Sequence, residues 1–310
     1  MGFVQYRHTA VDGHQVFYRE AGPQDGRTIV LLHGFPSSSH MFRELIPLLA
    51  GSYHVIAPDM LGFGYSDAPG VDDFTYTFDA LADVTAKLLT KLNVSSYSIY
   101  VQDYGAPVGW RLALNAPHSI EAIVTQSGNA YEVGFFDSFW TRRAMAYGAN
   151  PVPETEAAVR AAFTVEDVRW QYLTGTPDAT LVAPDAWHHD VERMSRPGID
   201  RVQLALFRDY GHNVPLYPHV HRYLRDSGVP TLAVWGKGDE IFGPDGARAF
   251  AQDAVDPEIH LLEGGHFLLE SSAPEVAALM VDFLQRRLPQ PPSRSIAHTT
   301  PTPAHLDGRQ

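Results

Sequence analysis

The chain has 310 residues, 45% of them hydrophobic, and a formal net charge of −13 from 23 Lys and Arg against 36 Asp and Glu. This size and composition are typical of one large globular domain with room for an inserted subdomain. The negative charge argues against a nucleic-acid partner. Because the sequence contains no cysteine, disulfides, thiolate metal sites and cysteine nucleophiles are excluded.

Eight strand-like runs and five helical patterns follow one another along the chain. The strands are expected at about residues 4–8, 16–19, 28–32, 54–57, 98–101, 122–126, 231–235 and 259–262. The helices are expected at about residues 41–49, 78–92, 104–115, 244–253 and 273–288. A hairpin followed by alternating strands and helices predicts an α/β fold, with a mainly parallel sheet and helices on both faces.

The alternation of strand and helix stops between the sixth and seventh strands. We expect a first core segment at residues 1–129, a helical cap at 130–226, a second core segment at 227–290 and a disordered, proline-rich tail at 291–310. Such an insertion would lie over the carboxyl ends of the strands, where open α/β sheets bind ligands.

The N-terminal residues lack the apolar segment of a secretory signal, and no run approaches the ~20 apolar residues needed to span a bilayer. We therefore expect a cytoplasmic protein without a membrane partner. The sequence leaves open whether it forms a homodimer.

Residues 98–110 contain an apolar run that breaks sharply into a helical stretch, and Asp103 stands at the break. This pattern predicts a nucleophile elbow, a tight strand-to-helix turn that directs one side chain into a pocket and usually carries serine. Taken alone, Asp103 would also suit a helix N-cap. Val101 departs from the small residue usual two positions before the nucleophile.

An aspartate at the elbow predicts alkyl transfer to the enzyme followed by hydrolysis. A serine that attacked an sp³ carbon would leave an ether, which water does not easily cleave. An aspartate leaves an ester, which water can hydrolyse.

Three further motifs supply the other groups that this chemistry needs. His-Gly-Phe-Pro at residues 33–36 follows the third strand, so the backbone N–H groups of Phe35 and Tyr104 are expected to form an oxyanion hole. Asp239 lies in a glycine-rich loop after the seventh strand, and His266 lies in Gly-Gly-His after the last strand. Together with Asp103 they give nucleophile, acid and base in the chain order that this fold requires.

The expected roles follow from each chemical step. Asp103 attacks, His266 deprotonates water, and Asp239 holds the histidine tautomer. The two N–H groups stabilise the oxyanion by ~3 kcal/mol each. We expect no cofactor and no metal, and only a small-molecule substrate and water as partners. Adjacent His188 and His189 lack a spacing that would direct both at one ion.

With these motifs and the segment at residues 55–66, the chain resembles the aspartate-nucleophile branch of the α/β-hydrolase superfamily over residues 10–288. That branch contains epoxide hydrolases and haloalkane or haloacid dehalogenases. The resemblance implies an eight-stranded α/β-hydrolase fold with a helical cap, whose residues decide the leaving group.

An epoxide oxygen needs an acid, which epoxide hydrolases supply with two cap tyrosines. Haloalkane dehalogenases hold the halide with side-chain N–H groups, at positions that are Phe35 and Tyr104 here. Fluoroacetate dehalogenases carry an arginine where this chain has Tyr104. These departures from the dehalogenase patterns favour an epoxide as the substrate over a haloalkane or a haloacid.

For the activating tyrosines, the resemblance favours Tyr217, with Tyr147 or Tyr172 as its partner and Tyr131 kept open. We therefore expect a hydrolase that opens a small apolar epoxide to a diol. The alternatives are a dehalogenase with the same ester intermediate and, more remotely, a non-catalytic receptor or a luciferase-like protein on this fold.

Overall fold

Eight strands form one sheet across residues 3–289, the part of the chain that the computed structural model describes. Their order is β1-β2-β4-β3-β5-β6-β7-β8, with β1, β2 and β4 joined antiparallel and the strands from β4 to β8 parallel. The strands are β1 (Gln5–Val11), β2 (His14–Ala21), β3 (Thr28–Leu32), β4 (His54–Pro58), β5 (Tyr97–Gln102), β6 (Ile120–Gln126), β7 (Thr231–Gly236) and β8 (Glu258–Leu262). The predicted fold class is confirmed.

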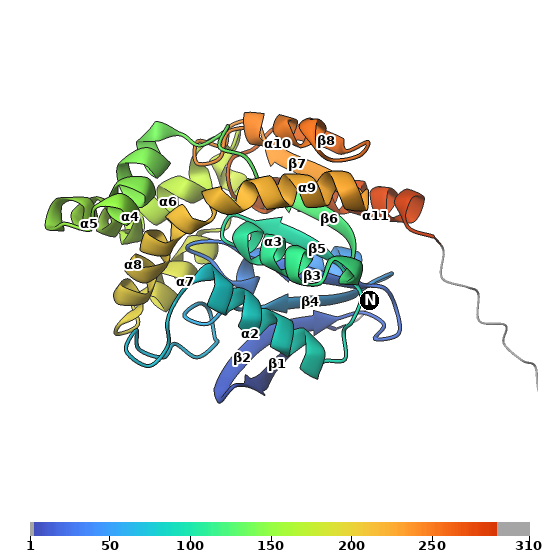
Figure 1. The fold of residues 1–310 in the computed structure, drawn as a ribbon, viewed down its shortest axis with the longest axis horizontal. Helices are drawn as coiled ribbons and strands as arrows, with labels where there is room; N and C mark the ends of the chain where they lie inside the picture. Colours follow the sequence, from blue (N-terminus) through green and yellow to red (C-terminus); the bar gives the residue numbers. More distant parts are fainter. Residues whose placement is uncertain (1–2, 290–310) are drawn as a thin grey trace, which may run out of the picture.

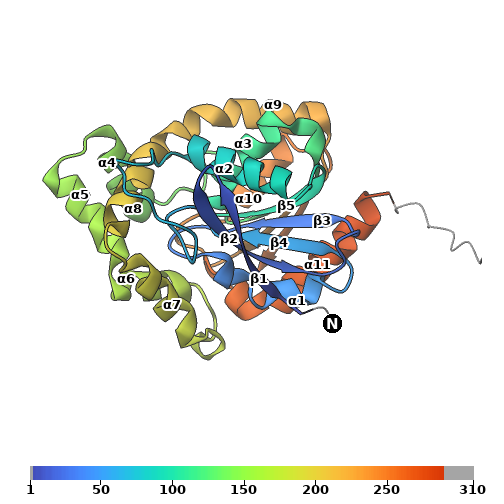
Figure 2. The same ribbon diagram turned by 90° about the horizontal axis from the view of Figure 1, so that it is seen from below.

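Helices cover both faces of this sheet (Figures 1 and 2). One face carries α2 (Phe78–Lys91), α3 (Gly105–Asn115) and α9 (Tyr217–Ser227), and the other carries α1 (Leu45–Leu49) and α11 (Leu269–Arg287). Strands β3, β4, β5 and β7 are buried along their whole length. Burial on both faces explains why these strands are mainly apolar instead of alternating between apolar and polar residues.

The segment between β6 and β7 is a helical insertion, residues 127–230, and it extends beyond the sheet end to which the parallel strands point (Figure 1). It contains the π-helix η3 (Asp137–Met145), α4 (Ala146–Ala149), α5 (Pro153–Arg160), α6 (Val165–Leu173), α7 (Pro184–Met194), α8 (Ile199–Asp209) and α9. The last of these runs beside α3 on the sheet face, so only the helices before α9 lie over the strand ends.

The remaining helices are short. They are α10 (Asp245–Ala249) and the 3₁₀ helices η1 (Ser39–Phe42), η2 (Pro117–Ser119), η4 (Ala161–Phe163), η5 (Ala179–Leu181), η6 (Tyr210–His212), η7 (Val214–Leu216) and η8 (Phe250–Gln252).

Two predicted helices differ from the structure because of proline. The helix expected at residues 41–49 is divided into η1 and α1, so that Pro47 falls in the first turn of α1, where no backbone N–H is needed. The helix expected at residues 273–288 begins earlier, at Leu269, and bends at Ser272, whose φ is −133°. Pro274 cannot donate in the preceding turn, which explains the bend.

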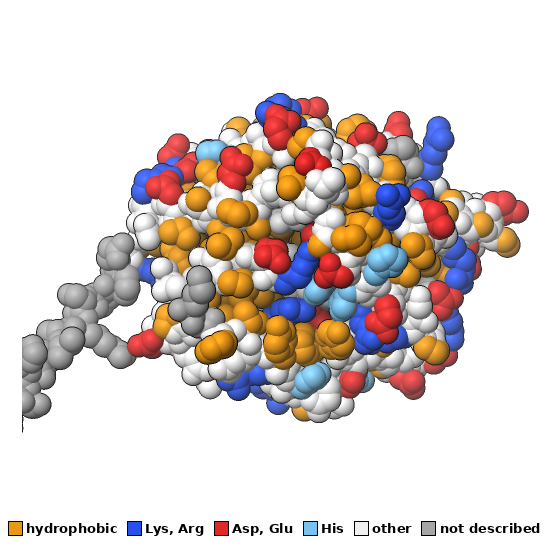
Figure 3. Space-filling view, turned by 180° about the vertical axis from the view of Figure 1, so that it is seen from behind, with side chains coloured by type: hydrophobic (Ala, Val, Ile, Leu, Met, Phe, Trp, Pro, Cys, Tyr) orange, Lys and Arg blue, Asp and Glu red, His pale blue; other side chains and the backbone are white. Residues whose placement is uncertain are grey.

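On the face shown in Figure 3, acidic and basic side chains are interspersed with hydrophobic ones rather than gathered into a stripe of one sign. Within residues 3–289, no helix has the length and apolar character to cross a membrane. The tail expected to be disordered, residues 291–310, lies outside the described residues.

Candidate active site

Asp103 occupies the tight turn between β5 and α3, with a backbone φ of +48°. A non-glycine residue in this left-handed region costs about 1–2 kcal/mol, so the surroundings must hold it there. Its N–H donates to the Ser127 carbonyl at 3.2 Å, and its carbonyl accepts from the N–H of Ala106 at 3.0 Å. A Cβ on Gly105 would lie 2.1 Å from the Leu32 carbonyl oxygen, so this position requires glycine.

The valine at residue 101 fits the elbow because the facing helix provides the space. A Cβ on Gly109 of α3 would lie 2.4 Å from Cγ1 of Val101. Gly109 on the helix is the small residue of this contact in place of one in the strand, so α3 approaches β5 closely.

The carboxylate of Asp103 is 4% exposed, and its two oxygens have different surroundings. Oδ1 accepts from the backbone N–H of Phe35 at 2.7 Å and of Tyr104 at 2.6 Å. Oδ2 faces Nε2 of His266 at 3.9 Å. Burial raises the pKa of Asp103 to about 6, against the opposing effects of His266 and the two N–H groups. At neutral pH Asp103 is therefore an anion with one oxygen held and the other free.

Asp239 is a fully satisfied hydrogen-bond acceptor in the loop after β7. Its Oδ1 accepts from the backbone N–H groups of Ile241 and Phe242 at 2.8 and 2.9 Å. Its Oδ2 accepts from the hydroxyl of Ser127 at 2.6 Å and contacts Nδ1 of His266 at 3.0 Å. Ser127, which the sequence analysis did not identify, therefore orients the carboxylate that orients the histidine.

His266 lies between two carboxylates. Because its Nδ1 donates to Asp239, the lone pair of the neutral ring is on Nε2, which faces Asp103. Burial lowers the pKa of His266, but the charges of Asp239 and Asp103 outweigh this effect and raise the pKa above its ordinary value. The structure thus brings together all five groups that the sequence placed at this site, the three side chains and the two backbone N–H groups.

Aromatic rings of the helical insertion pack against Phe35 and Tyr104, the neighbours of Asp103. Phe207 of α8 packs edge-on against Phe35 at 5.2 Å between ring centroids and against Tyr104 at 6.0 Å. Tyr210 packs against Tyr104 at 5.9 Å and Phe163 against Phe35 at 6.0 Å. The surroundings are therefore apolar, which strengthens every charge interaction within them.

Tyr210 and Tyr217 form a hydroxyl pair on this side of Asp103. Each hydroxyl influences the pKa of the other, and burial raises the pKa of each well above its ordinary value. The Asp103 charge contributes to the raised pKa of Tyr210, so the two groups interact electrostatically. The backbone stays helical from α8 through η6 and η7 into α9, so both tyrosines belong to one continuous helical segment.

Sequence analysis identified Tyr217 but not Tyr210. The available signal was the spacing of Gln203, Phe207 and Tyr210, at positions i, i+4 and i+7 along α8 and the start of η6, all of them buried in the structure. The sequence does not show what this side of the helical segment covers, so the same spacing would be expected for ordinary core packing of a helix.

The other tyrosines considered as partners of Tyr217 lie elsewhere, which corrects the expected pairing. Tyr147 lines an open cavity of about 660 Å³, and its charged neighbours among the described residues are Glu156, Arg208 and Arg160. Tyr172 donates to Asp190 and stacks on Phe267 at 3.8 Å. Tyr131 donates to Asp253 at 3.0 Å. Each of the three lies at a cavity or donates to a carboxylate elsewhere in the fold. Residue spacing along the chain does not predict these contacts.

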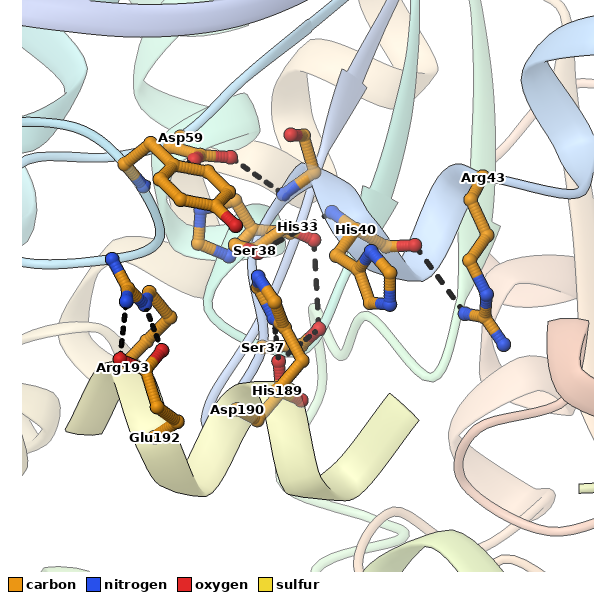
Figure 4. Close-up of polar contacts among 12 residues, drawn as sticks. His33, Ser37, Ser38, His40, Arg43, Asp59, His189, Asp190, Glu192 and Arg193 are labelled. Carbon is orange, nitrogen blue, oxygen red and sulfur yellow. Dashed lines mark hydrogen bonds and ion pairs between the residues drawn. The ribbon is translucent and has the colours of Figure 1, made fainter. Parts of the chain in front are cut away.

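A polar cluster joins α7 of the insertion to the loop that carries Phe35 (Figure 4). Oδ1 of Asp190 accepts from the Ser37 hydroxyl at 3.3 Å, and the N–H of Ser37 closes a turn on the Gly34 carbonyl at 3.0 Å. His189 contacts the same carboxylate at 3.3 Å and stacks on His40 at 4.3 Å. Among residues 3–289, no group of three or more His, Asp or Glu side chains is arranged to hold a metal ion.

Residues 27–273 match the family described as the alpha/beta hydrolase fold. The chain belongs to this family. It is 42% identical over 275 residues to the uncharacterized hydrolase YNR064C of Saccharomyces cerevisiae, a match that spans 88% of this chain and 94% of the relative. It is 37% identical over 281 residues to a haloalkane dehalogenase of Mycolicibacterium paratuberculosis, spanning 88% and 89%. It is 27% identical over 283 residues to epoxide hydrolase 3 of Mus musculus, spanning 88% and 74%. The chain is therefore an enzyme, a hydrolase.

Proposed function

We propose that this hydrolase opens a small, largely apolar epoxide to a diol through a covalent ester on Asp103. The observation that carries the proposal is the pair of buried tyrosines, Tyr210 and Tyr217, of which Tyr210 packs on Tyr104 and interacts with the charge of Asp103. An epoxide oxygen leaves as an alkoxide and needs a proton donor, and two protonated hydroxyls meet that need. Phe35 and Tyr104 present backbone N–H groups to the carboxylate but have no side-chain N–H to hold a halide.

In the first step, Oδ2 of Asp103 attacks an epoxide carbon, because Oδ1 is already engaged by two N–H groups. The carbon–oxygen bond of the ring breaks, and the departing oxygen takes a proton from the tyrosine pair. Oδ1 becomes the carbonyl oxygen of the ester and stays between the N–H groups of Phe35 and Tyr104.

In the second step, Nε2 of His266 takes a proton from water and the resulting hydroxide adds to the ester carbonyl carbon. The two N–H groups hold the oxyanion that forms on Oδ1. When the intermediate collapses, the bond between Cγ and Oδ2 of Asp103 breaks, and Oδ2 leaves as a hydroxyl oxygen of the diol, taking the proton held by the imidazolium. The oxygen of the water remains in the restored Asp103 carboxylate, and its remaining proton returns to the tyrosine pair. Ester formation also removes the charge of Asp103, so the pKa of His266 falls when a neutral base is needed.

A dehalogenase with the same ester intermediate is the second candidate. Nε1 of Trp140 is buried without a hydrogen-bond partner among the described residues, and the indole stacks on Tyr210 at 4.2 Å. A free, buried indole N–H is a suitable donor to a departing halide. The dehalogenase relative at 37% identity adds support to this reading, as the epoxide hydrolase relative does to the first.

Intact-mass measurement of His266→Gln after incubation with panels of epoxides and haloalkanes separates the two candidates. The variant keeps Asp103 but lacks the base, so the ester should accumulate. An epoxide adds its whole mass, whereas a haloalkane adds only its alkyl group and releases halide. The Asp103→Asn variant is the control and should gain no mass. If no compound of either panel forms an adduct or is turned over by the wild type, both candidates are refuted.

A further inference from the structure

Gln102 makes a direct contact with the histidine that the proposed mechanism uses as its base. It is the last residue of β5 and fully buried, and its carboxamide Nε2 lies 2.8 Å from Nε2 of His266. Its Oε1 is buried and has no hydrogen-bond partner among the described residues. A Cβ on Gly34 would lie 2.4 Å from that oxygen, so the glycine of the His-Gly-Phe-Pro motif leaves room for this side chain.

The direction of this hydrogen bond determines which form of the histidine it stabilises. The amide N–H can donate only to an unprotonated ring nitrogen, and Nδ1 already donates to Asp239. A protonated Nε2 would point its own hydrogen at the amide hydrogens. The contact therefore favours the neutral ring with its lone pair on Nε2.

The other polar neighbours of the ring act in the opposite direction. The charged groups that face it are Asp239, in the loop after β7, and Asp103, at the end of β5, and both favour the imidazolium. The remaining ring contacts, Phe242 at 5.8 Å and Phe267 at 5.3 Å, are uncharged. Apart from burial, Gln102 is the one contact within residues 3–289 that opposes the two carboxylates.

We propose that Gln102 is a positioning residue that holds His266 as a neutral base by donating to its Nε2 lone pair. This inference rests on the proposed ester mechanism. At the hydrolytic step, a water O–H replaces the amide N–H at the same lone pair, so one donor is exchanged for another. The proton then moves from water to Nε2 as the hydroxide adds to the ester carbonyl.

Two substitutions test the proposal. Gln102→Met keeps the length of the side chain but removes the donor, and Gln102→Glu replaces it with a carboxylate that favours the imidazolium. Gln171→Met is the matched control, because Gln171 is an equally buried glutamine on α6 of the insertion, hydrogen bonded to Asp167. Each variant is titrated by NMR of the His266 ring and followed by single-turnover hydrolysis of an epoxide-derived ester across pH.

We expect Gln102→Met to raise the pKa of His266 by about 0.5–1 unit, as the loss of one hydrogen bond predicts. Gln102→Glu should raise it further. The acid limb of ester hydrolysis should move to higher pH by similar amounts. Gln171→Met should leave both unchanged.

The proposal is overturned if the His266 titration of both Gln102 variants coincides with that of the wild type. This measurement is made on the free protein and does not depend on turnover, so it is informative even if no substrate is found. If the titration shifts as expected but His266→Gln forms no adduct on Asp103, the ester mechanism fails while the assigned contact stands. If the Met variant does not fold, the Glu variant still gives the decisive titration.

Discussion

Replacing Asp103 by asparagine should stabilise the folded hydrolase at neutral pH while abolishing ester formation. An aspartate in the unfolded chain ionises near pH 3.8, whereas burial raises the pKa of Asp103 in the folded protein to about 6. The folded state therefore binds this proton more tightly than the unfolded chain does. Stability contributed by the protonated group is present below about pH 4 and is lost as pH rises towards 6.

The size of the effect follows from the difference in pKa. A difference of roughly 2, at ~1.4 kcal/mol for each pKa unit, corresponds to about 3 kcal/mol of unfolding free energy at pH 8. Asparagine keeps an oxygen that can accept from the N–H groups of Phe35 and Tyr104 but carries no charge. The variant should therefore avoid the free-energy cost of burying the Asp103 charge while keeping the two hydrogen bonds from these N–H groups.

Urea unfolding of wild type and Asp103→Asn at pH 8 and pH 4 provides the measurement. The variant should be about 3 kcal/mol more stable at pH 8, and the difference should shrink to below about 1 kcal/mol at pH 4. Asp245→Asn is a suitable control, since Asp245 is a surface residue paired with Arg248 and should change stability by less than about 0.5 kcal/mol. Equal stability at pH 8, or a difference that is the same at both pH values, would refute the reasoning.

Three further substitutions have defined outcomes. Tyr217→Phe removes one hydroxyl of the pair and should slow ester formation from an epoxide by roughly 10- to 100-fold in single turnover, with a larger loss when Tyr210 is also replaced; unchanged kinetics would remove Tyr217 from the mechanism. Gly34→Ala should lower the unfolding free energy by about 1–3 kcal/mol, because the new Cβ would lie 2.3 Å from the Cβ of the elbow aspartate; stability like that of the wild type would show that the loop can move aside. Asp190→Ala should cost about 1–3 kcal/mol in urea unfolding and slow ester formation, because the loop that carries the Phe35 N–H loses its hydrogen bond through Ser37; an effect on stability alone would separate the cluster from catalysis.

The strands and the positions of the three site side chains could be predicted from local sequence. The central strands are mainly apolar, and Asp103, Asp239 and His266 each follow a strand within a few residues. Since parallel strands end at the same edge of a sheet, motifs that are far apart in the chain are expected to meet there.

The helices of the insertion and the partners of its side chains could not be predicted in the same way. Tyr147, Tyr172 and Tyr210 are all tyrosines in amphipathic or short helical segments, and nothing local distinguishes them. Their roles depend on which helix face covers Asp103, and that is decided by packing among α8, α9 and the loop after β3.

By itself, the sequence determined the fold class and the place of Asp103 at the strand-to-helix turn, because strand periodicity and turn motifs act over a few residues. Only the tertiary structure showed which side chains are neighbours. Tyr210 lies near Tyr217, Tyr172 donates to Asp190, and Gln102 contacts His266. These contacts join residues on different elements, so their geometry comes from how the elements pack and not from any spacing along the chain.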